Sequence, residues 1–324
     1  MGILSSISIG INPNLIDIGN FILSWHGVMT FIAVAVAVWL VARWGAKEGM
    51  IVDSIYSVSV WAIIGGVVGA RALHVIDFWD EVYKHDFVSV FLVWSGGIAI
   101  YGAILGGFAG GALYIIVRNS EWFLSLWRTI FPFMGEAHRA NLPSIGRLAD
   151  ITAPALLIAQ AIGRIGDIIN GEHCSRATDL IWGWVFTHPD SPGRYCILND
   201  QQGYFGESAT SNTPVHPAVV YEMIWNMISL AIVWRLRDRL TPDGSLWMVY
   251  LALYAIGRFS VQWVRLDAVK FAGLQEAHII AILVLAVAVP FLVLKTRFVI
   301  RSGASGDHQV ARGRRRRKAQ AGQT

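Results

Sequence analysis

Long apolar runs, separated by shorter polar segments, dominate the chain. Each run is long enough to cross a hydrocarbon layer of about 30 Å as a helix. The third run is rich in glycine, so its helix can begin later than the run itself. The seven runs are residues 21–43, 54–76, 91–117, 150–171, 217–235, 245–265 and 275–295. This pattern predicts an all-α polytopic membrane protein of about seven transmembrane helices, with residues 1–295 forming one membrane domain.

The composition agrees with a membrane protein. Hydrophobic residues make up 55% of the chain and charged residues 15%, whereas about a quarter of the residues in soluble domains are charged. The 14 tryptophans suit the aromatic belts at membrane–water boundaries. The first residues lack the basic segment of a cleavable signal peptide, so we expect none to be removed.

Lysines and arginines predict which side of the membrane each loop faces. They concentrate after the first, third and fifth spans and in the C-terminal tail, which places these parts, including an insertion at residues 119–147, in the cytoplasm. The N-terminus and residues 172–215 then lie outside, the latter as a small extracytoplasmic head between spans four and five.

The tail at residues 296–324 contains a basic run at 314–318. Such a run either binds nucleic acid or acidic lipid, or is a disordered anchor against the anionic inner leaflet. The composition of the tail favours the disordered anchor. We therefore expect membrane lipids, and no nucleic acid, as its partners.

Both cysteines of the chain, Cys174 and Cys196, lie in the predicted head. A location outside the cell permits a disulfide. Sequence alone does not show whether the two sulfur atoms meet. A bridge and two free thiols therefore both stay open.

Polar side chains gather toward the outer ends of the predicted spans. Charge inside a membrane is costly and usually lines a functional cavity. The residues in question are His26, Arg71, Tyr101, Arg164, Asp167, Asn170, Glu172, Glu222, Arg258, Gln262 and Arg265. Several arginines in a half-buried cavity predict an anionic ligand, because guanidinium binds phosphate in a bidentate manner. In a membrane, the most available phosphate diester is a phospholipid head group.

Less specific explanations exist for single members of this set. Arg71 or Arg265 alone can extend its head group to water, and His26 can serve only as a hydrogen-bonding residue at the interface. The glycines of the third span can simply allow close helix packing. No cluster with the spacing of metal ligands is evident, so we expect no metal and no cofactor.

Six short motifs, taken in order, resemble those of the prolipoprotein diacylglyceryl transferase family over about residues 20–295. They are Ser24-Trp25-His26-Gly27, Gly69-Ala70-Arg71, WSGGIAIYG at 94–102, GRIGDIINGE at 163–172, His216-Pro217 followed by Tyr221-Glu222, and Gly257-Arg258-Phe259 followed by Arg265. The resemblance implies an enzyme of the bacterial plasma membrane. Such an enzyme transfers the sn-1,2-diacylglyceryl group of phosphatidylglycerol to the lipobox cysteine of a preprolipoprotein, forming a thioether and releasing glycerol phosphate.

The resemblance also implies roles for individual residues. Arg164 and Arg258 match essential arginines of the family, and they are expected to hold the phosphate and to stabilise the charge of the leaving group. Glu222 matches an acidic position and is expected to orient an arginine. The set expected to bind phosphatidylglycerol is Arg164, Arg258, Arg265, Asp167, Asn170, Gly171, Glu172, Glu222, Gln262 and Arg71.

Four positions depart from the best-known family form. Tyr101 stands where that form has histidine, and His26 stands where it often has tyrosine. The base that activates the substrate thiol is therefore Tyr101 or His26, or the two together. Asp167 replaces an asparagine and Gln262 a common glutamate, and we expect these two charge changes to offset each other if they face one chamber.

Other functions stay open at this level. An inactive paralogue that binds phospholipid or lipoprotein would tolerate the departures at Tyr101, Asp167 and Gln262. A transporter would predict inverted repeats, and the sequence shows no repeat. A different enzyme of phosphoglycerol chemistry would be marked by metal dependence. The oligomeric state has no signal in the sequence.

Overall fold

Seven long helices occupy the predicted apolar runs. The computed structural model describes residues 6–18, 21–92, 97, 99–134, 139, 142, 144–172, 174–199, 203–205, 209–267 and 269–299. The long helices are α1 (Trp25–Lys47), α2 (Val52–Asp77), α3 (Ile100–Asn119), α5 (Ile145–Asn170), α7 (Ala218–Leu236), α8 (Ser245–Gln262) and α9 (Glu276–Lys295). Among the described residues, six helices are long and apolar enough to cross a membrane, and α8 is not one of them. The prediction of an all-α polytopic membrane protein is confirmed.

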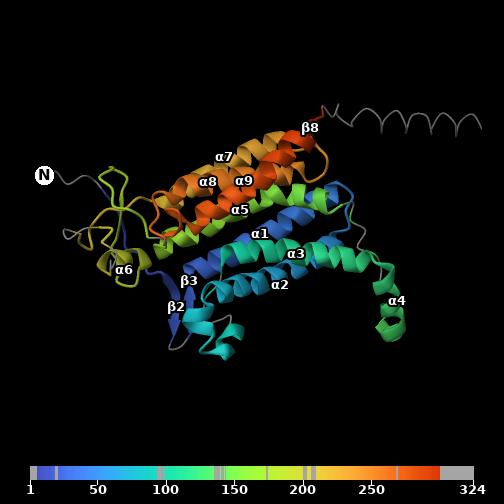
Figure 1. Cartoon of the computed structure of the whole chain (residues 1–324), viewed down its shortest axis with the longest axis horizontal. Coiled ribbons are helices and arrows are strands. Elements are labelled where there is room, and N and C mark those ends of the chain that lie inside the picture. The colour runs from blue at the N-terminus through green and yellow to red at the C-terminus, as the bar shows by residue number, and fades with distance from the viewer. Residues whose placement is uncertain are drawn as a thin grey trace, which may run out of the picture.

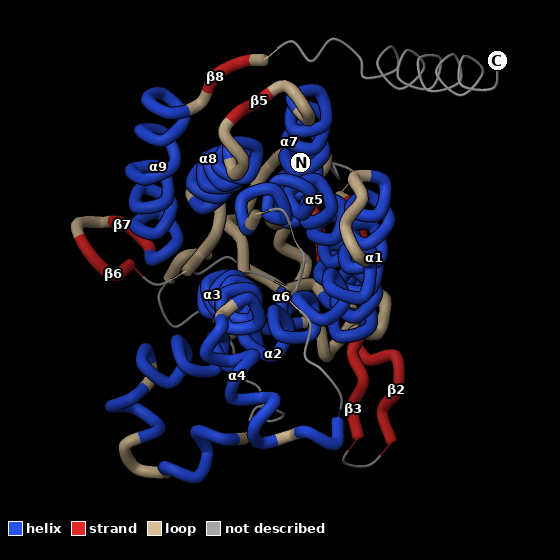
Figure 2. The backbone as a smooth tube through the Cα atoms, turned by 90° about the vertical axis from the view of Figure 1, so that its right-hand side faces the viewer, coloured by secondary structure: helices blue, strands red, loops and turns tan. Residues whose placement is uncertain are grey.

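The long helices lie side by side, with successive ones running in opposite directions (Figures 1 and 2). Helix α5 lies between a group formed by α1, α2 and α3 and a group formed by α7, α8 and α9. Its residues Ala153 and Leu157 have no exposed surface. One apolar cluster joins α5 to α1 and α2, and a second joins it to α7 and α8. Helix α5 is thus the central element of the bundle.

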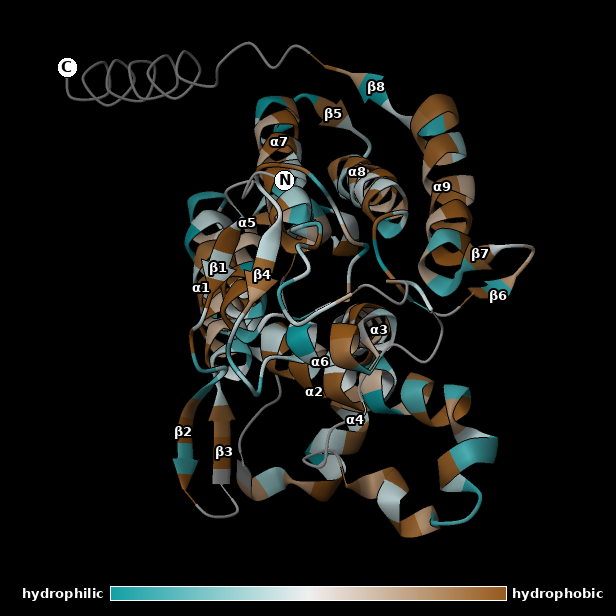
Figure 3. Cartoon of the chain, turned by 90° about the vertical axis from the view of Figure 1, so that its left-hand side faces the viewer, coloured by the Kyte–Doolittle hydropathy of each residue, from teal (hydrophilic) through white to brown (hydrophobic). Residues whose placement is uncertain are grey.

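Apolar residues make up much of the long helices, as their colouring in Figure 3 shows, and many of these residues are exposed on the outside of the bundle. Phe31, Leu105 and Val293 are each at least 70% exposed. A water-soluble protein rarely presents such an extended apolar surface. Lipid chains are the environment that suits these helices.

Small elements distinguish the two ends of the bundle. The head end carries the parallel strands β1 (Ile7–Ile9) and β4 (Trp184–Phe186), helix α6 (Pro192–Leu198) and the hairpin of β2 (Asn14–Ile18) and β3 (Phe21–Ser24). A disulfide joins Cys174 to Cys196. The tail end carries the antiparallel strands β5 (Leu240–Thr241) and β8 (Arg297–Phe298). The basic run of the tail lies outside the described residues.

The remaining elements are short. They are the helical turns η1 (Trp79–Tyr83), η2 (Phe87–Phe91) and η4 (Pro132–Met134), helix α4 (Glu121–Ile130), and the hairpin of β6 (Val269–Phe271) and β7 (Leu274–Gln275). Helix α4 and η4 fall within the predicted insertion at 119–147, and α4 extends away from the bundle (Figure 1).

Two helices begin later than the start of the apolar run. Residues 21–24 form strand β3, and Ser24 then caps α1 by accepting a hydrogen bond from the Gly27 amide at 3.2 Å. Helix α3 begins at Ile100 rather than residue 91, as the glycine content of the run allowed. Before this start, Val90 and Gly97 are held by Arg71, whose guanidinium donates to their carbonyls at 2.9 Å each. Gly97 has a φ of +76°, a conformation that favours glycine.

Helices α2 and α3 touch backbone to backbone through glycines. A Cβ atom at Gly106 would lie 2.3 Å from the carbonyl oxygen of Gly65, and one at Gly69 would lie 2.3 Å from that of Gly102. Small residues at such crossings allow van der Waals packing that larger residues prevent. The glycines of the third span therefore have a packing role.

We predict that Gly106→Ala destabilises the protein by about 1–3 kcal/mol, the usual cost of overpacking, because the helices must separate. Gly107→Ala is the matched control, since its Cβ would lie 3.3 Å from the nearest atom, the Ala62 carbonyl oxygen. Thermal unfolding in detergent measures both variants. Equal unfolding temperatures for the two would contradict the backbone contact.

Candidate functional site

A single buried carboxylate, that of Glu222, gathers three arginines at the head end. Glu222 lies in the first turns of α7 and is 6% exposed. Its Oε1 accepts a hydrogen bond from Nη1 of Arg258 on α8 at 2.5 Å and lies 3.7 Å from Nη1 of Arg265. Its Oε2 forms an ion pair with Arg164 on α5. The prediction that Glu222 orients an arginine fits this geometry.

Two further carboxylates balance the arginine charges. Arg164 donates to Oδ2 of Asp167 at 2.6 Å, one helical turn along α5. Arg265 donates from Nε to Oδ2 of Asp267 at 3.2 Å. Burial disfavours the charge on Asp267, but Arg265 and a hydrogen bond from Gln262 outweigh it and hold the pKa of this carboxyl below its ordinary value. A guanidinium has five N–H donors, so each arginine retains the capacity to bind a phosphate as well.

His26 joins the cluster from the start of α1. Its Nδ1 lies 2.5 Å from Oδ1 of Asp167 and 3.7 Å from Oε2 of Glu172. The helices cross closely here, since a Cβ at Gly166 would lie 2.8 Å from the Cα of His26. Asn170 accepts from the His26 amide at 3.3 Å and donates to Glu172 at 3.1 Å. The GRIGDIINGE stretch therefore holds the first turn of α1.

Two tyrosines lie next to the arginines. The Tyr101 hydroxyl on α3 is buried beside the Arg258 guanidinium, with which it interacts. Tyr254 lies one turn before Arg258 on α8 and interacts electrostatically with both Arg164 and Arg258. Tyr254 was not among the residues predicted from the sequence. Its position four residues before Arg258, on the same helix face, was the available signal.

Gln262 takes part in a buried network below Arg265. Its side chain has no exposed surface. Its amide donates to Asp267 and to Gln275, and Gln275 in turn donates to the Arg265 carbonyl at 3.1 Å. Asp267 and Gln275 were not predicted, because Asp267 lies in the polar loop after the sixth apolar run and Gln275 is the first residue of the seventh. A direct contact of Gln262 with substrate stays a prediction.

The described contacts of Arg71 and Gly171 are with residues outside the arginine cluster around Glu222. The described contacts of Arg71 are to the carbonyls of the loop before α3 and to the ring of Tyr83, 5.1 Å from its centroid. Gly171 ends α5 with a φ of +70°, and a Cβ there would lie 2.2 Å from the Ser191 hydroxyl. Both residues shape the head end, and their predicted contacts with substrate stay predictions.

Three side chains lie close enough together to be considered as ligands of one metal ion. The ligand atoms of His26, Asp167 and Glu172 lie within 4.8 Å of one another. Both oxygens of Asp167 already contact a basic side chain, Oδ1 that of His26 and Oδ2 that of Arg164. A metal cation would have to compete with the Arg164 guanidinium. We therefore assign this trio to ion pairing.

Comparisons with known proteins agree on one family. The model of the family "Prolipoprotein diacylglyceryl transferase" matches residues 13–294. A relative from Thermosynechococcus vestitus is 30% identical over 273 residues, covering 84% of this chain and 88% of the relative. One from Synechococcus elongatus is 29% identical over 307 residues, covering 91% and 93%. Both relatives bear the name phosphatidylglycerol–prolipoprotein diacylglyceryl transferase.

The central position of Glu222 predicts a large cost for its removal. Glu222→Gln leaves three neighbouring guanidinium groups without their shared counter-charge, and breaking a buried ion pair in this way costs about 3–5 kcal/mol. Glu172→Gln is the control, because the Glu172 side chain is 28% exposed. Thermal unfolding in detergent measures both, and a loss for Glu222→Gln no greater than that for Glu172→Gln would contradict its central role.

Proposed function

The chain belongs to the prolipoprotein diacylglyceryl transferase family, and we propose that it transfers the diacylglyceryl group of phosphatidylglycerol to a prolipoprotein. The sulfur of the lipobox cysteine forms a bond with the sn-3 carbon of the lipid glycerol. The bond from that carbon to the phosphate oxygen breaks, which leaves a thioether and free glycerol phosphate. The thiol proton passes to a base. The observation that carries this proposal is the family match over residues 13–294, together with the arginines around Glu222.

The arginines suit both the substrate and the leaving group. Phosphatidylglycerol carries one negative charge on its phosphate, and glycerol phosphate gains a second charge as the carbon–oxygen bond breaks. Arg164 and Arg258 approach Glu222 from α5 and α8, so a phosphate bound beside Glu222 meets guanidinium groups from two helices. Preorganised donors stabilise developing charge most effectively in a site of low dielectric.

His26 is the base that this geometry favours. The contact of its Nδ1 with Asp167 leaves Nε2 as the proton acceptor when Nδ1 carries the hydrogen. The His26 side chain is 40% exposed, so a substrate thiol can approach it. Asp167 then orients the ring, as carboxylates do for catalytic histidines. We expect Tyr101, next to Arg258, to bind the phosphate.

The same contacts suggest which of the positions that differ from the best-known family form are physically coupled. Asp167 contacts His26 and Arg164, whereas Gln262 contacts Asp267 and Gln275. The Asp167 carboxylate thus pairs with Arg164 and contacts His26, and Asp267 provides a carboxylate beside Gln262. The offset expected between Asp167 and Gln262 is untested, and the contacts favour His26 as the residue coupled to Asp167.

The topology follows from the basic residues at the tail end. Arg43, Lys47, Arg118 and Arg235 lie near the ends of helices there, so the tail end faces the cytoplasm. The head at 172–215 and the N-terminus then face outward, in the plasma membrane of a bacterium. Residues 1–295 form the membrane domain, 119–147 a cytoplasmic insertion and 296–324 a cytoplasmic tail. The outward orientation brings the site to the face where a lipobox segment and outer-leaflet phosphatidylglycerol meet.

We predict that Arg258→Ala lowers the rate of transfer by about 10²–10³-fold, the usual cost of losing one donor to a developing anion. Arg128→Ala on α4 is the control and should leave the rate unchanged. The assay follows glycerol phosphate released from phosphatidylglycerol liposomes that contain a lipobox peptide. Folded wild-type protein that binds phosphatidylglycerol without releasing glycerol phosphate would instead favour an inactive phospholipid-binding paralogue.

The His26–Asp167 contact predicts coupled effects. His26→Tyr and Asp167→Asn should each slow transfer. The double variant restores the residues of the best-known family form, and its transfer rate should be higher than the two single effects multiplied together predict. The difference corresponds to a coupling free energy of about 0.5–3 kcal/mol. The rate of the His26→Tyr variant should also lose the dependence on an ionisation near neutral pH. Asp167→Asn with Gln262→Glu is the matched double variant and should be additive. Additive effects for His26 and Asp167, with an unchanged pH profile, would sink the assignment of His26 as the base.

A further inference from the structure

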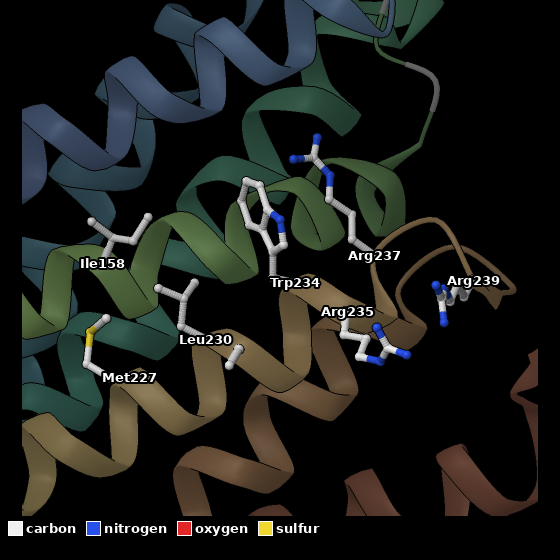
Figure 4. Close-up of a pocket in the computed structure, with 8 residues that line it drawn as sticks. Ile158, Met227, Leu230, Trp234, Arg235, Arg237 and Arg239 are labelled. Carbon is white, nitrogen blue, oxygen red and sulfur yellow. The ribbon is translucent and has the colours of Figure 1, made fainter. Parts of the chain in front are cut away.

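An open groove lies on the bundle surface between α5 and α7, toward the tail end. Its volume is about 600 Å³. Ile158, Met227, Leu230 and Trp234 form its apolar wall, and Arg235 and Arg239 lie at its basic end (Figure 4). Met227 and Trp234 are each about half exposed, at 50% and 49%. The groove is thus amphipathic along its length, apolar at one end and cationic at the other.

This groove is separate from the candidate active site. Arg235 follows Glu222 by 13 residues in α7, which places it about 20 Å further along the helix axis. The active site lies at the head end, whereas Arg235 occupies the last turn of α7. A ligand in the groove and a substrate on Glu222 therefore occupy opposite ends of one helix.

The arginines at the basic end differ in their partners. Arg237 lies over the rings of Trp44 and Trp234, 5.0 and 5.4 Å from their centroids, and its Nη2 lies 3.8 Å from Oε1 of Glu48. Within the described part of the chain, the guanidinium groups of Arg235 and Arg239 form no ion pair. Two uncompensated cations thus adjoin an apolar wall at the end of a membrane-length helix.

We propose that this groove binds one anionic phospholipid of the leaflet opposite to the active site. An acyl chain lies against Met227, Leu230 and Trp234, along two turns of α7. The phosphate lies between Arg235 and Arg239, since guanidinium groups form charge-assisted hydrogen bonds with phosphate oxygens. A lipid is the one common molecule of a membrane that has both an acyl chain for the wall and an anion for the arginines.

Binding there stabilises the part of the fold that carries the site. Ile158 belongs to α5 and the other wall residues to α7, so a lipid in the groove contacts both helices at once. Those two helices also carry Arg164 and Glu222. A ligand that binds only the folded state raises stability by mass action, so an anionic lipid should raise the unfolding temperature of the protein.

The test uses the purified full-length protein in detergent with phosphatidylserine as the probe. Native mass spectrometry and thermal unfolding compare the wild type with Arg235→Gln/Arg239→Gln. The double variant should retain phosphatidylserine about tenfold less well, as expected for lost charge-assisted hydrogen bonds, and should lose most of the thermal stabilisation. Arg43→Gln/Lys47→Gln removes two charges from the same end of the bundle and should behave as the wild type.

Three results would overturn the proposal. Equal retention by the wild type and Arg235→Gln/Arg239→Gln would show that these arginines bind no lipid. Equal stabilisation by phosphatidylcholine would show an apolar groove without preference for an anion, and equal stabilisation by inorganic phosphate would show an ion site without a lipid. If the double variant does not fold, Met227→Trp tests the same site, because it fills the wall while both arginines remain. It should weaken phosphatidylserine retention, and unchanged retention would overturn the proposal.

Discussion

The site depends on one carboxylate that lies among three guanidinium groups. Arginines at close range repel one another, and burial in a membrane protein would make that repulsion severe. Glu222 permits Arg164, Arg258 and Arg265 to approach from different parts of the chain. Asp167 and Asp267 complete the charge balance at the two sides of this cluster. The cluster around Glu222 can therefore present several cations to a phosphate while their charges are balanced in the resting protein.

The helix packing places this cluster. Successive helices alternate in direction, so the starts of α1, α3, α7 and α9 meet the ends of α2, α5 and α8 at the head end (Figure 1). Close crossings at glycines fix the distances, as between Gly106 and Gly65 or between Gly166 and His26. Arg71 also holds the carbonyl of Gly97, three residues before α3 begins at Ile100. Residues that lie far apart in the sequence are thereby brought to one end of the molecule.

The sequence predicted the helices and the end at which polar residues gather, because long apolar runs and alternating direction are enough for both. It did not predict which side chains pair, since pairing depends on the rotation of each helix about its axis. Asp167 thus contacts His26, and Gln262 contacts Asp267. Tyr254 was missed because a tyrosine in an apolar run is ordinary. The late start of α1 was missed because Ser24 caps the helix after the apolar run has begun.

The measurement that tests this account most directly is a cryo-electron microscopy structure of the protein with phosphatidylglycerol in a lipid nanodisc. The account predicts a phospholipid phosphate at the head end, in contact with Arg164 and Arg258 and beside Glu222, with the sn-3 carbon facing the space next to His26. A phosphate bound elsewhere at the head end, with the arginines contacting only Glu222, Asp167 and Asp267, would contradict it. The arginine cluster would then be a structural ion-pair network.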